Sequence, residues 1–173
     1  MIAYILIIIG AVARLLPHMP NFTPVGALAL FGGAKLKNKY AAILAPVAIM
    51  AMTDFYLGFH KLILFTWGSM ALVALIGFWV RKKYGLGRIA LGTLAGSILF
   101  FVITNFGVYL EGWYGYNFSG LVQTYVMAIP FFRNSLMGDV FYSAVFFGCY
   151  ELVIYWRKKY LAFKVAGQVV SSH

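Results

Sequence analysis

The chain has 173 residues, of which 63% are hydrophobic and only 10% are charged. A soluble domain of this length cannot bury so much apolar surface, so the composition excludes a soluble protein and indicates a single membrane domain, residues 1–173. The net charge of +10 does not indicate a nucleic-acid partner, because eleven of the fourteen Lys and Arg residues lie in three clusters, at 35–39, 81–88 and 157–164. Each cluster follows an apolar run, and membrane lipid of negative charge is its expected partner.

Six apolar segments follow one another along the chain. They predict an all-α polytopic membrane protein, a bundle of six transmembrane helices. The segments are residues 2–16, 24–34, 40–58, 62–80, 89–108 and 134–156.

The three basic clusters set the predicted orientation. The positive-inside rule places them in the cytoplasm. Both termini then lie inside the cell, and the connections 17–23, 59–61 and 109–133 face outward. The expected location is the inner (plasma) membrane.

The second segment is too short to cross a bilayer, because an eleven-residue helix rises about 16 Å, roughly half of the hydrocarbon thickness. The preceding loop, PHMPNFT, contains two prolines and predicts irregular backbone that dips into the membrane beside a wet cavity. Thr23 is predicted to cap the helix and Pro24 to begin it. We expect the amides of its first turn to face the cavity and to hold an anionic group.

The connection 109–133 is long and rich in aromatic residues. Its first part predicts a loop, and its second part predicts a short interfacial helix that ends near Pro130. Trp113 and Tyr116 are candidates for a lid that closes over a ligand. The alternative is an aromatic belt at the outer interface.

Asp54 lies inside the third segment, where an ionisable side chain costs several kcal/mol unless it meets a partner or a wet cavity. Arg14 is its predicted partner. If no ligand contacts this pair, the two charges neutralise each other and hold the fold. Other polar candidates lie on the same side of the membrane: His18, Asn21, His60, Asn105, Asn134 and Asp139.

The inner halves of the segments carry almost no charge. Glu151 is the exception, and we expect it to pair with the neighbouring basic residues. A channel or proton pump needs polar groups through the full thickness of the membrane. Polar residues gathered on one side of the membrane favour capture of a solute instead.

A metal site would need His18, His60, Asp54 and Asp139 to come together, and no ligand spacing in the sequence supports it. The sequence also contains no Gly-rich phosphate loop, nucleophile elbow or HExxH motif. We therefore predict no resident metal or cofactor, no catalytic residue and no enzymatic activity.

Four stretches together carry a resemblance to a known family. They are RLLPHMPNFTPVGA at 14–27, DFYLGFH at 54–60, TNF at 104–106 and PFFRNSLMGD at 130–139. The chain resembles the S components of energy-coupling factor (ECF) transporters, and among them the solitary S components associated with vitamin B12. The resemblance implies a six-helix subunit that binds a vitamin in an outward-facing pocket.

The resemblance adds expectations about single residues. Positions that match His18 and Asp54 line the pocket in the vitamin B12 group, and Phe22 belongs to the first motif. That group has a cobalt-binding Cys near the position of Trp67, so its cobalt–thiolate chemistry does not transfer to this chain. S components that dock on ECF transmembrane and ATPase subunits usually carry Ala-x-x-x-Ala on the first helix. Here Ala3 is followed by Ile7.

The sequence thus predicts a substrate-binding subunit for uptake of a vitamin-like small molecule, with cobalamin or a related compound as the implied ligand. The alternative is an accessory structural subunit of a larger membrane complex, with the polar cluster as an internal network. A small membrane enzyme is a third class, which would need a metal or cofactor held by His18 and Asp54. A vitamin-sized pocket favours the first class, and a collapsed, fully paired cluster favours the second.

Overall fold

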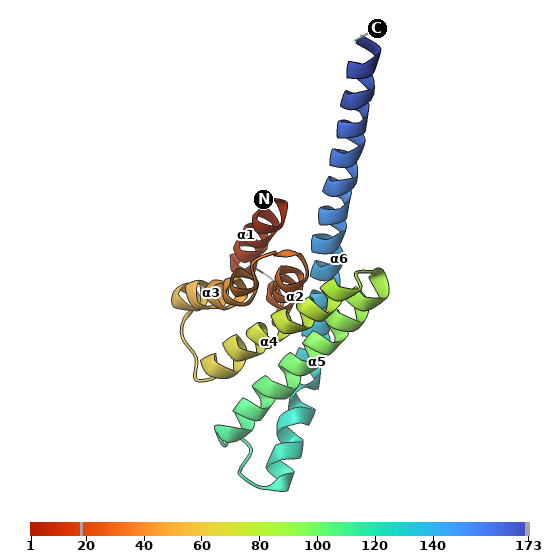
Figure 1. Cartoon of the computed structure of the whole chain (residues 1–173). Coiled ribbons are helices and arrows are strands. Elements are labelled where there is room, and N and C mark those ends of the chain that lie inside the picture. Colours follow the sequence, from red (N-terminus) through yellow and green to blue (C-terminus); the bar gives the residue numbers. More distant parts are fainter. Residues whose placement is uncertain (18, 172–173) are drawn as a thin grey trace.

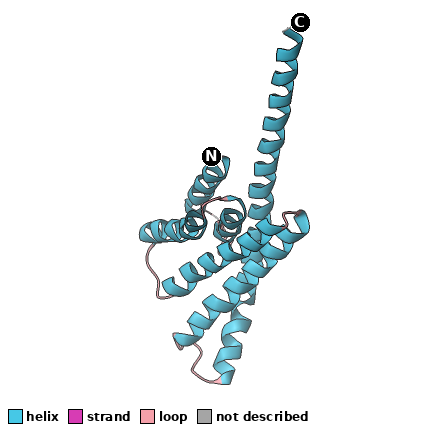
Figure 2. Ribbon diagram, in the orientation of Figure 1, coloured by secondary structure: helices cyan, strands magenta, loops and turns pink. Residues whose placement is uncertain are grey.

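The computed structural model describes residues 1–17 and 19–171, with side chains up to residue 164. Over this part of the chain all regular secondary structure is α-helix, as Figure 2 shows, which confirms the prediction of an all-α protein. The helices are α1 (Ile2–Leu15), α2 (Val25–Lys35), α3 (Lys39–Leu57), α4 (Ile63–Lys82), α5 (Leu86–Leu110) and α6 (Phe118–Ser171).

Four of the six helices, α3 to α6, are long and apolar enough to cross a membrane. The chain is therefore a membrane protein with several candidate spans. α1 and α2 are shorter apolar helices of 14 and 11 residues. The predicted count of six complete spans stays a prediction.

The short helix α2 forms the centre of the bundle and packs against all the other helices (Figure 1). Its side chains are buried all round, and Leu28 and Leu30 lie on opposite faces of it with no more than 1% of their surface exposed. A helix that is apolar on every face is stable only when it is enclosed. The length of α2 therefore suits a helix surrounded by protein.

α2 and α4 cross with their backbones in contact. A Cβ atom built on Gly33 would lie 2.0 Å from the carbonyl oxygen of Ala74, and one on Gly77 would lie 2.4 Å from that of Leu30. Small residues permit this close approach in membrane helices. Arg81 of α4 also donates to the carbonyl of Gly33, at 2.6 Å, and so satisfies one of the last carbonyls of α2.

α6 corrects the prediction for residues 109–133. The loop after α5 ends at residue 117, and no separate interfacial helix follows, because α6 begins at Phe118 and continues through Pro130. Proline removes one helical hydrogen bond. Packing against α5 on both sides of it offsets this loss: the ring of Phe101 lies 5.6 Å from that of Tyr125 and 4.7 Å from that of Phe132. The other end of α6 extends well beyond the bundle (Figure 1).

The first two basic clusters and α6 meet at one end of the bundle, which we call the Lys35 end. The Lys35 ammonium lies 2.7 Å from Glu151 and 3.4 Å above the centre of the Tyr84 ring. The expected pairing of Glu151 with a basic residue is thus confirmed. Burial raises the pKa of Tyr84, and its hydrogen bond to Glu151 raises that pKa further. The polar residues at the end of α1 and α3 lie at the opposite end, which we call the Arg14 end.

Candidate functional site

Arg14 and Asp54 form the predicted buried ion pair at the Arg14 end. The pair joins the last turn of α1 to the last turn of α3, with Nη2 of Arg14 2.6 Å from Oδ1 of Asp54. Their side chains are 11% and 3% exposed. Arg14 also donates through Nη1 to the sulfur of Met50.

The second carboxylate oxygen of Asp54 is engaged as well. The indole of Trp67, on α4, donates to Oδ2 at 2.9 Å, and Nε2 of His60 lies 3.7 Å from the same oxygen. Three of the predicted site residues therefore converge on Asp54: Arg14, His60 and Trp67. Because both oxygens have partners, this carboxylate is suited to fix the position of Arg14 rather than to contact a ligand itself.

Two cavities lie at this end of the bundle, and Arg14 lines the first of them. The first, which we call the Arg14 cavity, has a volume of about 180 Å³. Its lining residues are Arg14, Asn21, Thr23, Val25, Met50, His60, Thr66, Met70, Phe100 and Ser135. The second, the Asn105 cavity, has a volume of about 230 Å³. Its lining residues are Asn21, Leu62, Thr66, Phe100, Phe101, Thr104, Asn105, Val108, Ala128, Phe131, Phe132 and Ser135. The cavities share four residues and are therefore neighbours.

The loop before α2 folds inward, as predicted, because Asn21 and Thr23 line the Arg14 cavity. Asn21 adopts a left-handed backbone conformation with φ of 62°, which Asn tolerates better than most residues. Asn134 of α6 donates to the carbonyl of Pro20 at 3.2 Å and so ties the loop to α6. His18 lies outside the described residues.

Phe22 and Asn134, two further predicted site residues, support the loop instead of lining a cavity. The ring of Phe22 packs against Phe141 and Tyr142 of α6, with ring centres 5.8 and 5.7 Å away. Behind it, a Cβ atom on Gly138 would lie 3.1 Å from the Cα atom of Phe22. The loop and α6 are thus in close contact.

The start of α2 differs from the prediction. The helix begins at Val25 with Pro24 as N-cap, and no side chain of the cap residue bonds to the helix, so Thr23 is not the cap. The backbone of Ala27, in the first turn, bonds to the carboxyl group of Asp139. The partner that the sequence assigned to a ligand at these amides is thus a carboxyl group of the protein itself, supplied by α6.

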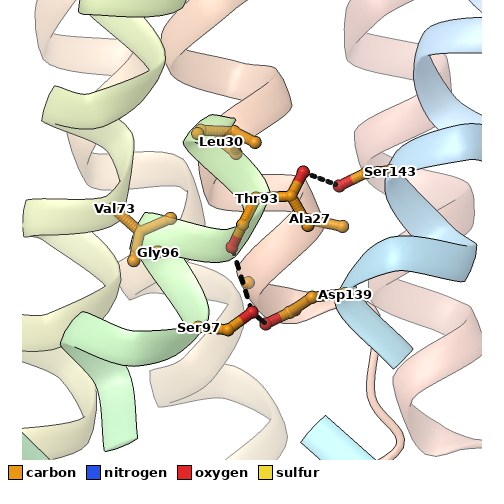
Figure 3. Close-up of a pocket in the computed structure, with 10 residues that line it drawn as sticks. Ala27, Leu30, Val73, Thr93, Gly96, Ser97, Asp139 and Ser143 are labelled. Carbon is orange, nitrogen blue, oxygen red and sulfur yellow. Dashed lines mark hydrogen bonds between the residues drawn. The ribbon is translucent and has the colours of Figure 1, made fainter. Parts of the chain in front are cut away.

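Asp139 belongs to a separate polar cluster inside the bundle (Figure 3). It is 7% exposed, and its Oδ2 atom lies 2.6 Å from the hydroxyl of Ser97 on α5. Thr93 and Ser143 meet beside them at 3.0 Å. The cavity between these side chains has a volume of about 10 Å³, enough for a single water molecule. The structure therefore does not bring Asp139 to the Arg14 cavity.

Three predicted residues remain. Asn105 lines the Asn105 cavity, and its amide donates to the carbonyl of Phe101 at 2.7 Å. Trp113 and Tyr116 are 70% and 72% exposed and line neither cavity. Their arrangement does not form a lid over either cavity.

Sequence reasoning missed the hydroxyl groups of the cavity walls. Thr66 and Ser135 line both cavities, and Thr104 lines the second. Thr66 and Thr104 also donate to carbonyls of their own helices, at 3.1 and 2.8 Å. Hydroxyls that bond in this way cost little in an apolar segment, so they give no signal in a hydropathy pattern.

The donor set of the site suits an organic solute better than a metal ion. Within the described residues no three His, Cys, Asp or Glu side chains come close enough to hold a metal. Arg14 and Asn105 supply hydrogen-bond donors, the Thr and Ser hydroxyls donate or accept, and Phe100 offers an aromatic wall. A few polar groups in a largely apolar cavity are typical of small-molecule sites.

A model described as a family of unknown function, DUF6580, matches residues 1–164. No curated protein matches the chain. No solved structure matches it either.

Proposed function

The chain belongs to this family of unknown function, DUF6580, and we propose that it is a membrane-embedded binding subunit for uptake of a vitamin-like small molecule. One observation carries the proposal: two neighbouring cavities with polar and aromatic walls lie at the Arg14 end, beside a buried cation. Buried polar groups at a cavity are costly for stability, so they are typical of sites that bind.

The cavities define the chemistry of the proposed solute. Arg14 favours a carboxylate or a carbonyl group, because its guanidinium donates several hydrogen bonds in one plane. Phe100 and Phe101 favour a flat ring at the second cavity. Volumes of about 180 and 230 Å³ suit a molecule of one or two rings. A corrinoid such as cobalamin would require both cavities to open into one.

The proposed orientation follows from charge. The basic clusters of the Lys35 end belong in the cytoplasm of a plasma-membrane protein, with both termini inside. The Arg14 end and both cavities then face outward, which suits capture of a solute from outside the cell. This orientation rests on the positive-inside rule.

The proposed subunit works without the usual ECF docking contact. Ala3 and Ile7 stand where docking S components carry two alanines, and they are only 8% and 6% exposed. Side chains buried against their own bundle are unavailable to a transmembrane partner. We therefore propose a solitary subunit in place of one that docks on a shared ATPase module.

A structural subunit of a larger complex is the second candidate function. The observation that favours it is the paired state of Asp54, whose two oxygens are both engaged. By this account the pair holds α1 against α3 and the cavities are packing defects. The two candidates differ in one respect: only a binding subunit changes its stability when a solute enters the cavities.

Ser135 offers a direct test because it lines both cavities. We would purify the full chain and measure its thermal unfolding with a panel of water-soluble vitamins and their precursors. A solute that binds the folded state raises the unfolding temperature. Ser135→Phe fills both cavities and should abolish this rise, whereas Ser119→Phe, at an exposed position of the same helix, should retain it.

Two results would overturn the proposal. One is the absence of any stabilising compound in the panel. The other is an unchanged response of a folded Ser135→Phe chain. Thr66→Phe fills the same space from α4 and replaces Ser135→Phe if that variant does not fold.

A further inference from the structure

Asp139 and the hydroxyl groups around it form a buried cluster that lies outside the two solute cavities. Asp139 is buried, and its immediate surroundings consist of glycine, alkyl and hydroxyl groups. A carboxylate in such surroundings has a large desolvation cost unless a cation or a proton neutralises it. Arg14 neutralises the charge of Asp54, so the desolvation cost of Asp139 has to be offset in another way.

Among the described residues, those that line the small cavity beside Asp139 include no cationic side chain. α4 contributes Val73, α6 contributes Ser143, and the remaining lining residues from α2 and α5 are Gly26, Ala27, Leu30, Gly92, Thr93, Gly96 and Ser97. On α6 itself, Arg133 is exposed and lies about 9 Å before Asp139 along the helix axis. Tyr142, the nearest phenol in sequence, packs on Phe22.

The hydroxyl groups of the cluster make one more contact than they have protons. The hydroxyl of Ser97 lies 3.0 Å from the carbonyl of Thr93 and 2.6 Å from Asp139. The hydroxyl of Thr93 lies 2.9 Å from the carbonyl of Ile89 and 3.0 Å from the hydroxyl of Ser143. Each hydroxyl donates only one proton. The cluster therefore has four such contacts but only three hydroxyl protons, those of Ser97, Thr93 and Ser143.

A proton on Asp139 completes this network. Oδ2–H of Asp139 then donates to Ser97, Ser97 donates to the carbonyl of Thr93, Ser143 donates to Thr93, and Thr93 donates to the carbonyl of Ile89. Every contact has one donor and one acceptor. The carboxyl group still accepts from the backbone of Ala27. With an ionised Asp139, Ser97 has to share its single proton between Asp139 and the carbonyl of Thr93.

The space around the carboxyl group of Asp139 is too small for a metal cation, but it can accommodate a proton. The cavity holds about 10 Å³, and a Cβ atom on Gly26 would already lie 2.3 Å from Oδ1 of Asp139. A hydrated or multiply coordinated metal cation needs several oxygen ligands around it. The direct contact of 2.6 Å between Asp139 and Ser97 leaves no space for an ion between them.

We propose that Asp139 is a proton-binding site, which holds a proton at neutral pH and donates it to Ser97 through Oδ2. The site joins α6 to the first turn of α2, and Val25 of that turn lines the Arg14 cavity. Loss of the proton therefore alters the charge beside one wall of the proposed solute site. This last consequence rests on the proposed function, whereas the proton site itself does not.

The test is simple to interpret because Asp54 and Asp139 are the only two aspartates in the sequence. We would label the side-chain carboxyl carbon of aspartate with ¹³C and record the two resonances in the purified full chain at neutral pH. One resonance, from Asp54, should have the shift of an ionised carboxylate, and the other the shift of a protonated carboxylic acid. Exchange into deuterium oxide should move only the second resonance.

One folded variant is enough to assign the two carboxyl resonances. Asp139→Asn should remove the protonated signal, and Asp54→Asn should remove the ionised one. Two ionised signals at neutral pH would overturn the proposal, as would a protonated signal that survives in Asp139→Asn or disappears in Asp54→Asn. The measurement uses no solute, so a result against the proton site would leave the proposed uptake function unaffected. A result against solute binding would likewise leave the proton site unaffected.

Discussion

Arg14 and Asp54 are 40 residues apart in the sequence and meet at 2.6 Å, which joins the ends of α1 and α3 beside the Arg14 cavity. Trp67 holds the other oxygen of the carboxylate at 2.9 Å. Asp54 is therefore fixed from two sides, and it fixes Arg14 in the wall of that cavity. In the proposed function Arg14 contacts the solute and Asp54 positions Arg14.

The first prediction concerns the stability of this pair. Asp54→Asn leaves the Arg14 cation without its buried counter-charge, and breaking a buried pair from one side costs about 3–5 kcal/mol. The variant should unfold at a clearly lower temperature than the original chain. The double variant Arg14→Gln with Asp54→Asn should recover most of the loss, since the two changes couple.

Glu111→Gln provides the control for this comparison. Lys61 and Glu111 form an ion pair at 3.1 Å, but the Lys61 side chain is 79% exposed. Exposed pairs contribute little to stability. Equal unfolding temperatures for Asp54→Asn and Glu111→Gln would show that the buried pair does not hold the fold.

The second prediction concerns Gly26, where an added Cβ atom would lie only 2.3 Å from Asp139. Gly26→Ala should force α2 away from α6 and lower the free energy of unfolding by about 1–3 kcal/mol, the usual cost of overpacking. Gly148→Ala is the matched control, because a Cβ atom there meets nothing within 4 Å. The control should be neutral or slightly stabilising. A Gly26→Ala chain as stable as the control would contradict the observed contact.

The Arg14–Asp54 pair and the helical class could be predicted from sequence because each has a strong local signal. A charge inside an apolar run demands a partner, and Arg14 is the available cation on the same side. The pairing of Glu151 is predictable for the same reason. Long apolar segments likewise give α3, α4 and α5 to within a few residues.

The remaining features depend on tertiary contacts that no local pattern encodes. Pro130 indicates a helix end, yet packing of Tyr125 and Phe132 on α5 carries α6 through it. The sequence groups Asp139 with the solute site because it lies on the same side of the membrane as Asp54. Its separation from that site follows from the central position of α2, whose first turn binds it.

The third prediction concerns the other end of α2. Arg81 donates to the carbonyl of Gly33, so Arg81→Met leaves a buried carbonyl without that donor and should cost about 1–3 kcal/mol of stability. Lys82→Met removes a neighbouring charge from an exposed position and should change stability little. Chemical denaturation in mild detergent would measure both. Similar losses for the two variants would indicate a general effect of charge and not the bond to α2.

The fourth prediction concerns orientation. In a Cys149→Ser background, Lys37→Cys should react with a membrane-impermeant thiol reagent only after the cells are permeabilised, because the Lys35 end faces the cytoplasm in the proposed topology. Ser119→Cys, at the start of α6, should react in intact cells. Both positions are exposed on the protein. Reaction of both cysteines from the same side would refute the proposed topology.

Native mass spectrometry of the full chain, taken from membranes in mild detergent, tests the central claim of solute binding most directly. The account predicts a small organic molecule, distinct from lipid by tandem fragmentation, bound to the original chain and to Ser119→Phe but absent from Ser135→Phe. A folded original chain that carries no such molecule, or a Ser135→Phe chain that retains it, would contradict a binding site in the two cavities.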